Sequence, residues 1–338
     1  MIKQMEKKRK KQPGPANIYR EESRFLEELE IDENYKKLKK NELLDKFFSL
    51  VKEYKKLLKH ATKITRIGDS TQRRLLLANE KIEKQNKELA DSRKALLEEL
   101  SHAAEYVKSL IPAPLTRGPI LTEWCFVPSV QLGGDSLGYH WLDKEHFAMY
   151  LLDVCSHGVR PALLSVSVIN VLRSQNLLDT DFKKPGEVLT GLNQVFQMKK
   201  HHNLFFSIWY GVYNSMNRQL TFASAGHPPA LLLNGTNNKA IELRTPNLFI
   251  GGMSETSYRS ESIFMEKPAV LYIFSDGAFE VDGSKEDTIW DLKELKKFLE
   301  RWSKENNREL EQLHAFLRKI HGSSVLEDDF SILKVIFK

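Results

Sequence analysis

Four acidic motifs in this 338-residue chain contain the residue types that could bind metal ions. They are Gly133-Gly134-Asp135, the stretch 151–158 with Asp153, Ser275-Asp276-Gly277 and Glu327-Asp328-Asp329. Each lies at the edge of an apolar run, where an aspartate at a strand end can reach an ion beside the backbone. Hard cations such as Mg²⁺ and Mn²⁺ prefer oxygen ligands. Two such ions about 3.5–4 Å apart can share a water, lower its pKa and direct it at phosphorus. We therefore predict that the four motifs converge on a pair of divalent ions.

Other catalytic centres have weaker support in the sequence. Cys155 is not within a phosphate-cradling loop, and His201-His202 is an isolated pair without zinc-ligand spacing. A single Asp-Gly pair usually marks an ordinary turn. The metal-site prediction therefore rests on the order and spacing of the motifs and on the strands that flank them.

The elements around these motifs are predicted from hydrophobic periodicity. Short apolar runs predict buried strands, and apolar residues at helical spacing predict amphipathic helices. The predicted strands are 120–128, 147–152, 205–213, 219–224, 230–233, 269–274 and 330–337, and the predicted helices are 161–172, 185–198, 292–302 and 308–320. This order indicates an α+β fold in which two sheets pack face to face with helices outside.

The first third of the chain predicts a helical stalk. Heptad-spaced apolar residues form one seam from Leu43 to Ile64, and a second seam with d positions at Leu75, Ile82, Leu89, Leu96, Ala103 and Leu110. The a positions include Asn79 and Asn86, and asparagine at a favours an in-register dimer. We expect a parallel dimer, with a single helix packed on its own domain as the alternative. Ile111-Pro112 ends the stalk, because proline lacks the backbone donor that a helix needs.

An interruption at Gly68 separates the two seams and leaves two interpretations. It is either a stutter in a continuous coiled coil, or the point where Asp69 or Ser70 caps a second helix of a hairpin. The predicted organisation is a basic, partly disordered region at 1–40, the stalk at 41–110 and a catalytic domain at 111–338.

Composition places limits on the class of protein. Residues 1–12 carry six Lys or Arg against one Glu, which predicts either a solvated terminus or a tail that touches nucleic acid or anionic lipid. No apolar run reaches the ~18 residues of a membrane span, and no signal peptide is visible. Cys125 and Cys155 do not suggest a disulfide framework. A cytoplasmic protein is expected.

Residues from about 110 to 338 resemble the PPM-type (protein phosphatase 2C-like) metal-dependent Ser/Thr phosphatases, in the bacterial SpoIIE/RsbU-like branch. The resemblance is carried by five motifs in the family's order: Gly133-Gly134-Asp135, Asp153–Gly158, Ser224-Ala225-Gly226-His227-Pro228-Pro229, Ser275-Asp276-Gly277 and Asp328-Asp329-Phe330-Ser331. It implies a two-sheet β-sandwich flanked by helices with two Mn²⁺ or Mg²⁺ ions at one end.

The resemblance also implies roles for individual residues. Metal ligands would be Asp135, Asp153, the carbonyl of Val154, Asp276 and Asp328, with Asp329 as the alternative if the register slips by one. Asp135, Asp153 and Asp276 would act in catalysis through a metal-activated water. Three positions depart from the family's pattern: Gly138 where many relatives have an acidic residue, Ser156 where glycine is common, and Ser331 in place of threonine.

The implied function is hydrolysis of phosphoserine or phosphothreonine on a partner signalling protein, of the STAS-type anti-sigma-factor-antagonist class, under control of the dimerising stalk. The alternative is a dimeric adaptor whose phosphatase-like domain binds a partner without turnover, and nucleic-acid binding by residues 1–12 is a third hypothesis. His157 and His227 are candidate general acids, or they orient turns through hydrogen bonds.

Overall fold

The computed structural model describes residues 39–236, 239–282, 289–302, 309–323 and 325–338, together with Arg24 and Glu27. The predicted basic region 1–40 therefore lies almost entirely outside the described residues. Contacts divide the chain into two compact units, Met1–Arg93 and Lys94–Lys338. The second unit contains all of the strands described below.

The predicted stalk is one helix, α2 (Lys40–Ser109), of 70 residues. It runs through Gly68 without a break, so the hairpin alternative is wrong. A single glycine in a helix interior costs only about 1 kcal/mol, which a helix of this length can absorb. None of its residues is buried, and the seam residues Leu75, Ile82, Leu89 and Leu96 each expose more than half of their surface. No helix in the described ranges is both long and apolar enough to cross a membrane.

The segment after α2 is anchored on the sheets. Ile111 is buried in the core between them. The carbonyl of Pro112 accepts hydrogen bonds from Trp124 Nε1 at 3.0 Å and from the Tyr139 hydroxyl at 3.0 Å. The predicted helix stop at Ile111-Pro112 is therefore confirmed, since α2 ends at Ser109, and the carbonyl of Pro112 is bonded within the second unit.

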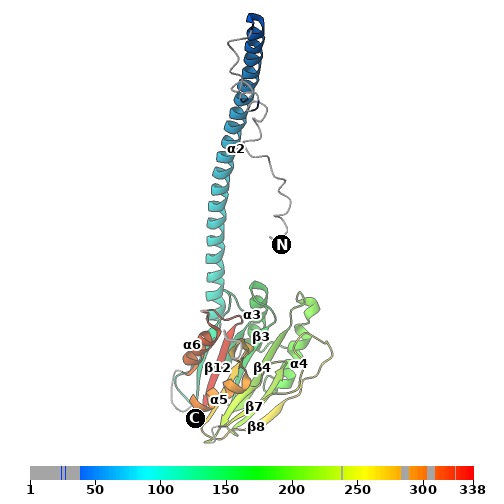
Figure 1. Ribbon diagram of the computed structural model, residues 1–338. Coiled ribbons are helices and arrows are strands. Elements are labelled where there is room, and N and C mark those ends of the chain that lie inside the picture. Colours follow the sequence, from blue (N-terminus) through cyan, green and yellow to red (C-terminus); the bar gives the residue numbers. More distant parts are fainter. Residues whose placement is uncertain are drawn as a thin grey trace. The chain divides into compact units, whose positions relative to one another are not determined.

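Two five-stranded antiparallel sheets form the second unit (Figure 1). One has the order β1-β12-β9-β6-β7 and the other β2-β3-β4-β5-β8. The strands of the first sheet are β1 (Ile120–Val127), β12 (Phe330–Phe337), β9 (Ala269–Phe274), β6 (Ala230–Asn234) and β7 (Ala240–Leu243). Those of the second are β2 (Ser136–Trp141), β3 (His146–Val154), β4 (Phe206–Asn214), β5 (Gln219–Ala225) and β8 (Glu261–Phe264).

Helices cover the outer faces of both sheets (Figure 1). The second sheet packs against α3 (Val159–Ser174) and α4 (Pro185–Val195), and the first against α5 (Leu292–Trp302) and α6 (Glu309–His321). Shorter elements are the 3₁₀ turns η5 (Met198–Lys200) and η6 (Asp276–Ala278) and the pair β10 (Val281–Asp282) and β11 (Ile289–Trp290). The predicted α+β sandwich flanked by helices is confirmed.

The sequence of β3 is a continuous apolar run because both faces of the strand are buried. Phe147, Met149 and Leu151 face the core between the sheets. Tyr150 and Leu152 face the core under α3 and α4. A strand buried on both faces has no polar side to alternate with. This burial places Asp153, the next residue, at the end of a fully packed strand.

Five strands were not predicted from the sequence: the two-residue pair β10 and β11, and the longer strands β2, β7 and β8. β2 contains Gly138 and His140, which weaken its apolar alternation, and β7 and β8 are edge strands of four residues with exposed positions. Short edge strands with charges are a common protection against edge-to-edge pairing, and they carry little hydrophobic signal. The helix predicted at 185–198 ends earlier, at Val195, and continues as η5.

Gly138 has a steric reason to be glycine. It pairs with Tyr150 in the sheet register, and a Cβ at Gly138 would lie 2.6 Å from the Tyr150 hydroxyl. Tyr150 is fully buried. The acidic residue that many relatives of the resembled family carry at this position would therefore overlap the tyrosine.

We predict that Gly138→Asp lowers the free energy of unfolding by about 2–4 kcal/mol, because it overpacks the core and buries a carboxylate. Thermal unfolding followed by near-ultraviolet circular dichroism would measure this. Gly68→Ala is the control, since a Cβ there meets no atom within 4 Å, and it should leave the transition of the two-sheet unit unchanged. Equal unfolding temperatures for Gly138→Asp and the unaltered protein would contradict the steric explanation.

Candidate metal centre

The predicted acidic motifs meet at one end of the two sheets. Asp153 is the penultimate residue of β3, and Asp135 immediately precedes β2, which pairs antiparallel with β3. Asp276 follows β9 and Asp328 lies just before β12, and these two strands are also antiparallel neighbours. Asp153, Asp276, Asp328 and Asp329 all line one cleft with a volume of about 730 Å³. The remaining aspartate, Asp135, is buried with 1 % of its surface exposed.

The two adjacent aspartates of the last motif do different things. Asp329 is buried, and its carboxylate accepts hydrogen bonds from the backbone N–H of Ser129 at 2.8 Å, the Ser129 hydroxyl at 3.0 Å and the backbone N–H of Gly134 at 2.8 Å. Asp328 is exposed, and its Oδ1 accepts one bond, from the N–H of Asp329 at 2.7 Å. Asp329 thus braces the loop before β2, whereas Asp328 presents its carboxylate to the cleft.

Glycines allow the motifs to approach one another. A Cβ at Gly133 would lie 2.0 Å from Oδ2 of Asp329, and one at Gly134 would lie 2.4 Å from the carbonyl oxygen of Val154. A Cβ at Gly277 would lie 2.2 Å from the carbonyl oxygen of Asp329. Side chains at these three positions would separate the loop before β2, the end of β3 and the start of β12.

The fourth and fifth motifs are also joined directly. The backbone N–H of Ser275 donates to the carbonyl of Ser331 at 3.0 Å, and the backbone N–H of Ser331 donates to the Ser275 hydroxyl at 3.2 Å. The same hydroxyl donates to the carbonyl of Asp329 at 3.2 Å. These bonds fix Asp276 and Asp328 relative to each other, each of them two positions outside its strand.

The crowding of carboxylates raises their pKa values. Burial, together with the charges of Asp153 and Asp329, raises the pKa of Asp135 well above its usual value. Burial and the charges of Asp276 and Asp328 raise the pKa of Asp153 to about 7. Burial and the charge of Asp328 raise the pKa of Asp276 to about 6. Like charges in a desolvated site favour the protonated form unless a cation compensates them.

The donor set fits divalent metal ions. Oδ2 of Asp135 is buried and accepts no hydrogen bond from the described residues, which leaves a lone pair available beside other carboxylates. Among the residues that the structure describes, no three Asp, Glu, His or Cys side chains are close enough to enclose a single ion. Oxygen ligands spaced in this way suit Mg²⁺ or Mn²⁺, since Mg²⁺ usually keeps several waters and takes only one or two carboxylates.

The two histidines near the cleft differ in their environment. His227 is buried, its Nδ1 lies 3.0 Å from the carbonyl oxygen of Pro228, and burial lowers its pKa to about 4. The neutral ring donates from Nδ1 to that carbonyl, so its Nε2 carries no proton, and the expected turn-orienting role is supported for His227. His157 is exposed in the cleft, and its ring forms no hydrogen bond to any described residue. A turn-orienting bond is therefore not found for His157.

Ser156 occupies a left-handed backbone conformation, with φ 73°. This region is accessible to glycine without strain and is costly for other residues. This φ explains why glycine is common at this position in the resembled family. Ser156 adopts the same conformation at a cost in backbone strain.

Three residues that line the cleft were not predicted from the sequence. Phe205 and Phe249 lie on its wall with their ring centroids 4.5 Å apart. Arg244 also lines the cleft, and it is the single Lys or Arg among the described lining residues. It directly follows the short strand β7, and no motif or periodicity in the sequence singles it out.

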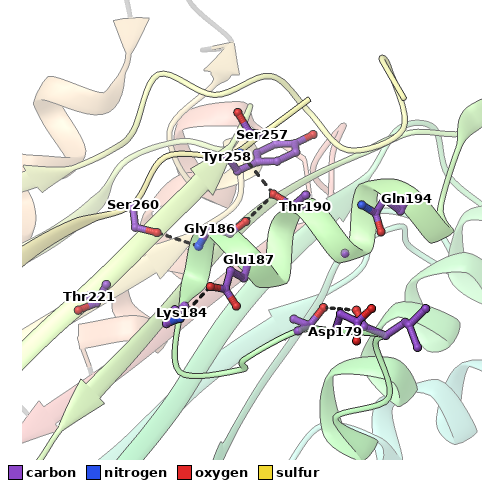
Figure 2. A pocket seen from close by; sticks show the side chains of 13 residues that line it. Asp179, Lys184, Gly186, Glu187, Thr190, Gln194, Thr221, Ser257, Tyr258 and Ser260 are labelled. Atoms are coloured by element: carbon purple, nitrogen blue, oxygen red, sulfur yellow. Dashed lines mark hydrogen bonds and ion pairs between the residues drawn. The ribbon is translucent and has the colours of Figure 1, made fainter. Parts of the chain in front are cut away.

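A second cavity, of about 600 Å³, lies between α4 and the segment 257–260 (Figure 2). Its polar groups bond to one another. Gly186 N–H donates to the Ser260 hydroxyl at 2.7 Å, the Thr190 hydroxyl donates to the Gly186 carbonyl at 2.7 Å, and Lys184 pairs with Glu187 at 2.9 Å. The Gly186–Ser260 bond attaches the segment to α4, and the other two bonds are local to α4. This cavity is therefore a polar seam between two elements.

Comparison with known proteins agrees with the fold. The sequence model described as Stage II sporulation protein E (SpoIIE) matches residues 143–338. The chain is 29 % identical over 209 residues to Phosphoserine phosphatase RsbU of Bacillus subtilis (strain 168), covering 61 % of this chain and 60 % of RsbU. It is 23 % identical over 187 residues to Phosphoserine phosphatase RsbP of the same organism, covering 55 % of this chain and 46 % of RsbP. The chain thus spans about three fifths or less of the length of these relatives.

Solved structures share the same fold. The SiaA-PP2C domain of Pseudomonas aeruginosa superposes with a TM-score of 0.63 at 18 % identity, covering 73 % of this chain and 99 % of that domain. The PP2C phosphatase domain of SpoIIE from Bacillus subtilis, solved with a fragment of its regulatory domain, gives a TM-score of 0.53 at 16 % identity, covering 67 % of this chain and 64 % of that one. The family match extends over more than half of the sequence, and the chain therefore belongs to the SpoIIE family.

Proposed function

We propose that this chain is a metal-dependent protein phosphatase that hydrolyses phosphoserine or phosphothreonine on a partner protein. The observation that carries the proposal is that Asp153, Asp276 and Asp328 line one cleft with Asp135 buried beside Asp153. The raised pKa values of Asp135, Asp153 and Asp276 call for a compensating cation. Membership of the SpoIIE family and the two relatives named phosphoserine phosphatases support it.

Each residue has a role in this proposal. Asp135, Asp153, Asp276 and Asp328 hold two Mn²⁺ or Mg²⁺ ions, with the Val154 carbonyl as a further ligand. Bound divalent ions supply an activated water and neutralise charge on a phosphoryl group. Asp329 positions the loop that carries Asp135, because its carboxylate is occupied by hydrogen bonds from Ser129 and Gly134. Phe205 and Phe249 form an apolar wall of the cleft.

The organisation of the chain extends the proposal. We infer a basic region at 1–40, a stalk at 41–110 that dimerises through its exposed seam and regulates activity, and a phosphatase domain at 111–338. The proposed substrate is a phosphorylated STAS-type anti-sigma-factor antagonist, as the family resemblance implies. The two cysteines, Cys125 and Cys155, are free, which supports a cytoplasmic location.

A second candidate function is a phosphatase-like adaptor without turnover. Gly138 and Ser156 favour it, since both depart from the family's pattern near the proposed metal ligands. The four retained aspartates favour the enzyme. Metal-dependent turnover of a phosphomonoester separates the two functions.

We predict that the purified protein hydrolyses a small aryl phosphate with Mn²⁺ or Mg²⁺ and stops with chelator. Asp153→Asn and Asp276→Asn should each lower kcat by about 100-fold or more, because each removes a metal ligand. Asp143→Asn is the matched control, since this exposed aspartate pairs with Lys183 at 2.8 Å and does not line the cleft. Absence of metal-dependent turnover would favour the adaptor.

We predict opposite consequences for the two neighbouring aspartates. Asp329→Asn should lower the free energy of unfolding by about 2–3 kcal/mol, because a buried carboxylate loses charge-assisted bonds. Asp328→Asn should leave the unfolding temperature nearly unchanged and weaken Mn²⁺ binding by 10-fold or more. Calorimetric unfolding and Mn²⁺ titration of both variants would measure this. Loss of Mn²⁺ affinity in Asp329→Asn without loss of stability would assign the ligand to Asp329 instead.

We predict that the full chain sediments as a dimer and that Ile82→Asp with Leu89→Asp converts it to a monomer. The charges would be buried in the seam of a coiled coil, where they are strongly disfavoured. Glu83→Lys with Glu88→Lys, at positions outside the a and d seam, serves as control for the altered charge. A monomeric unaltered protein at micromolar concentration would contradict the dimer.

A further inference from the structure

Arg244 is held in a rigid frame at the rim of the proposed metal cleft. On one side, buried Leu243 has its carbonyl bonded by the indole N–H of Trp209 at 3.0 Å. On the other side, Thr245 and Ser224 bond reciprocally: Ser224 N–H donates to the Thr245 hydroxyl at 2.8 Å, and Thr245 N–H donates to the Ser224 hydroxyl at 2.9 Å. The backbone of Arg244 is therefore fixed from both neighbours, while its side chain is exposed.

The chain beyond Arg244 is fixed as well. The Asn247 amide donates to the Ser224 carbonyl at 3.1 Å and to the Thr245 hydroxyl at 2.8 Å, and Gly226 N–H donates to the Asn247 carbonyl at 3.1 Å. Ser224 and Gly226 belong to the Ser224–Pro229 motif. The Ser224–Pro229 motif therefore holds the segment that follows β7 in place through these hydrogen bonds. This gives the motif a structural role beside the acidic motifs.

The far end of this segment is attached to α4. Ser260 and Tyr258 bond to Gly186 and Thr190 across the polar seam of Figure 2, at 2.7 Å and 3.4 Å. Nearer to Arg244 in the sequence, the Asn193 side chain donates to the Met253 carbonyl and accepts from Gly251 N–H. With both ends of the segment held, the position of Arg244 does not depend on a free loop.

The charge of Arg244 is opposite to that of its surroundings. The described walls of the cleft contain Asp153, Asp276, Glu280, Glu327, Asp328 and Asp329. Arg244 is their single Lys or Arg, and no carboxylate within the described ranges forms an ion pair with it. A phosphomonoester is a dianion, and a cleft with this many carboxylates repels it wherever metal ions do not compensate. Arginine suits this task, because its planar guanidinium donates two parallel bonds to phosphate oxygens and stays charged.

We propose that Arg244 binds the phosphoryl oxygens of the substrate and selects phosphomonoester dianions for the cleft. This inference rests on the proposed function, since it assigns a substrate-binding residue to the same site. Arg244 supplies binding and orientation of the phosphoryl group, and no covalent step is assigned to it.

The test compares Arg244→Ala and Arg244→Lys with Arg259→Ala. Arg259 is an exposed arginine farther along the same segment that does not line the cleft. With Mn²⁺ present, Arg244→Ala should raise KM for an aryl phosphate by about 10- to 100-fold and weaken competitive inhibition by inorganic phosphate by a similar factor. Arg244→Lys should recover part of both effects, because lysine keeps the charge and loses the bidentate geometry.

A second readout does not depend on turnover. Binding of inorganic phosphate to the Mn²⁺-loaded protein, measured by calorimetry, should be weakened in Arg244→Ala and unchanged in Arg259→Ala, with Mn²⁺ affinity and unfolding temperature preserved in both. Unchanged KM, phosphate inhibition and phosphate binding in Arg244→Ala would overturn the inference. If the unaltered protein lacks turnover, the proposed function fails, and the calorimetric comparison still decides the role of Arg244.

Discussion

The buried carboxylate of Asp329 is the interaction on which the arrangement of the site depends. It lies immediately before β12, a strand of one sheet, and its bonds reach Ser129 and Gly134, 200 and 195 residues earlier in the chain. These two residues belong to the connection from β1 to β2, which passes from one sheet to the other. One side chain therefore fixes the crossing between the sheets and the loop that carries Asp135. Gly133 approaches this carboxylate so closely that the brace tolerates no side chain at position 133.

The site combines rigid support with unfavourable charge. Asp135 is buried beside Asp153, and Asp153 faces Asp276 and Asp328, so that burial and like charges together disfavour ionisation. Such a cluster persists only because the surrounding backbone is strongly held, by the Ser275–Ser331 bonds on one side and the Asp329 brace on the other. An arrangement that stability alone would not favour is typical of functional sites.

Much of this arrangement could be predicted from the sequence. The continuous apolar run of β3 indicated a strand buried on both faces, and the order of the acidic motifs indicated that strand ends meet. The features that could not be predicted depend on contacts between residues that are distant in the sequence. In β2, Gly138 and His140 hide the alternation, and the reason for Gly138 is the buried ring of Tyr150 from a neighbouring strand. Adjacent Asp328 and Asp329 are chemically identical in the sequence, and only tertiary hydrogen bonds separate their roles. Arg244 has no sequence signature of its own. Its position is set by tertiary contacts to Ser224, to Trp209 and to helix α4, which are distant in the sequence.

The fully packed setting of β3 has a consequence for motion. β3 is paired with β2 on one edge and β4 on the other, and both of its faces are covered. Its amide hydrogens can exchange with solvent only through large-scale opening of the unit, since strands of this kind belong to the most protected part of a structure. Asp276 and Asp328, in contrast, lie on turns outside the ladder of strands. Asp153 therefore shares the protection of β3, whereas the positions of Asp276 and Asp328 depend on the hydrogen bonds that hold their turns, such as those between Ser275 and Ser331.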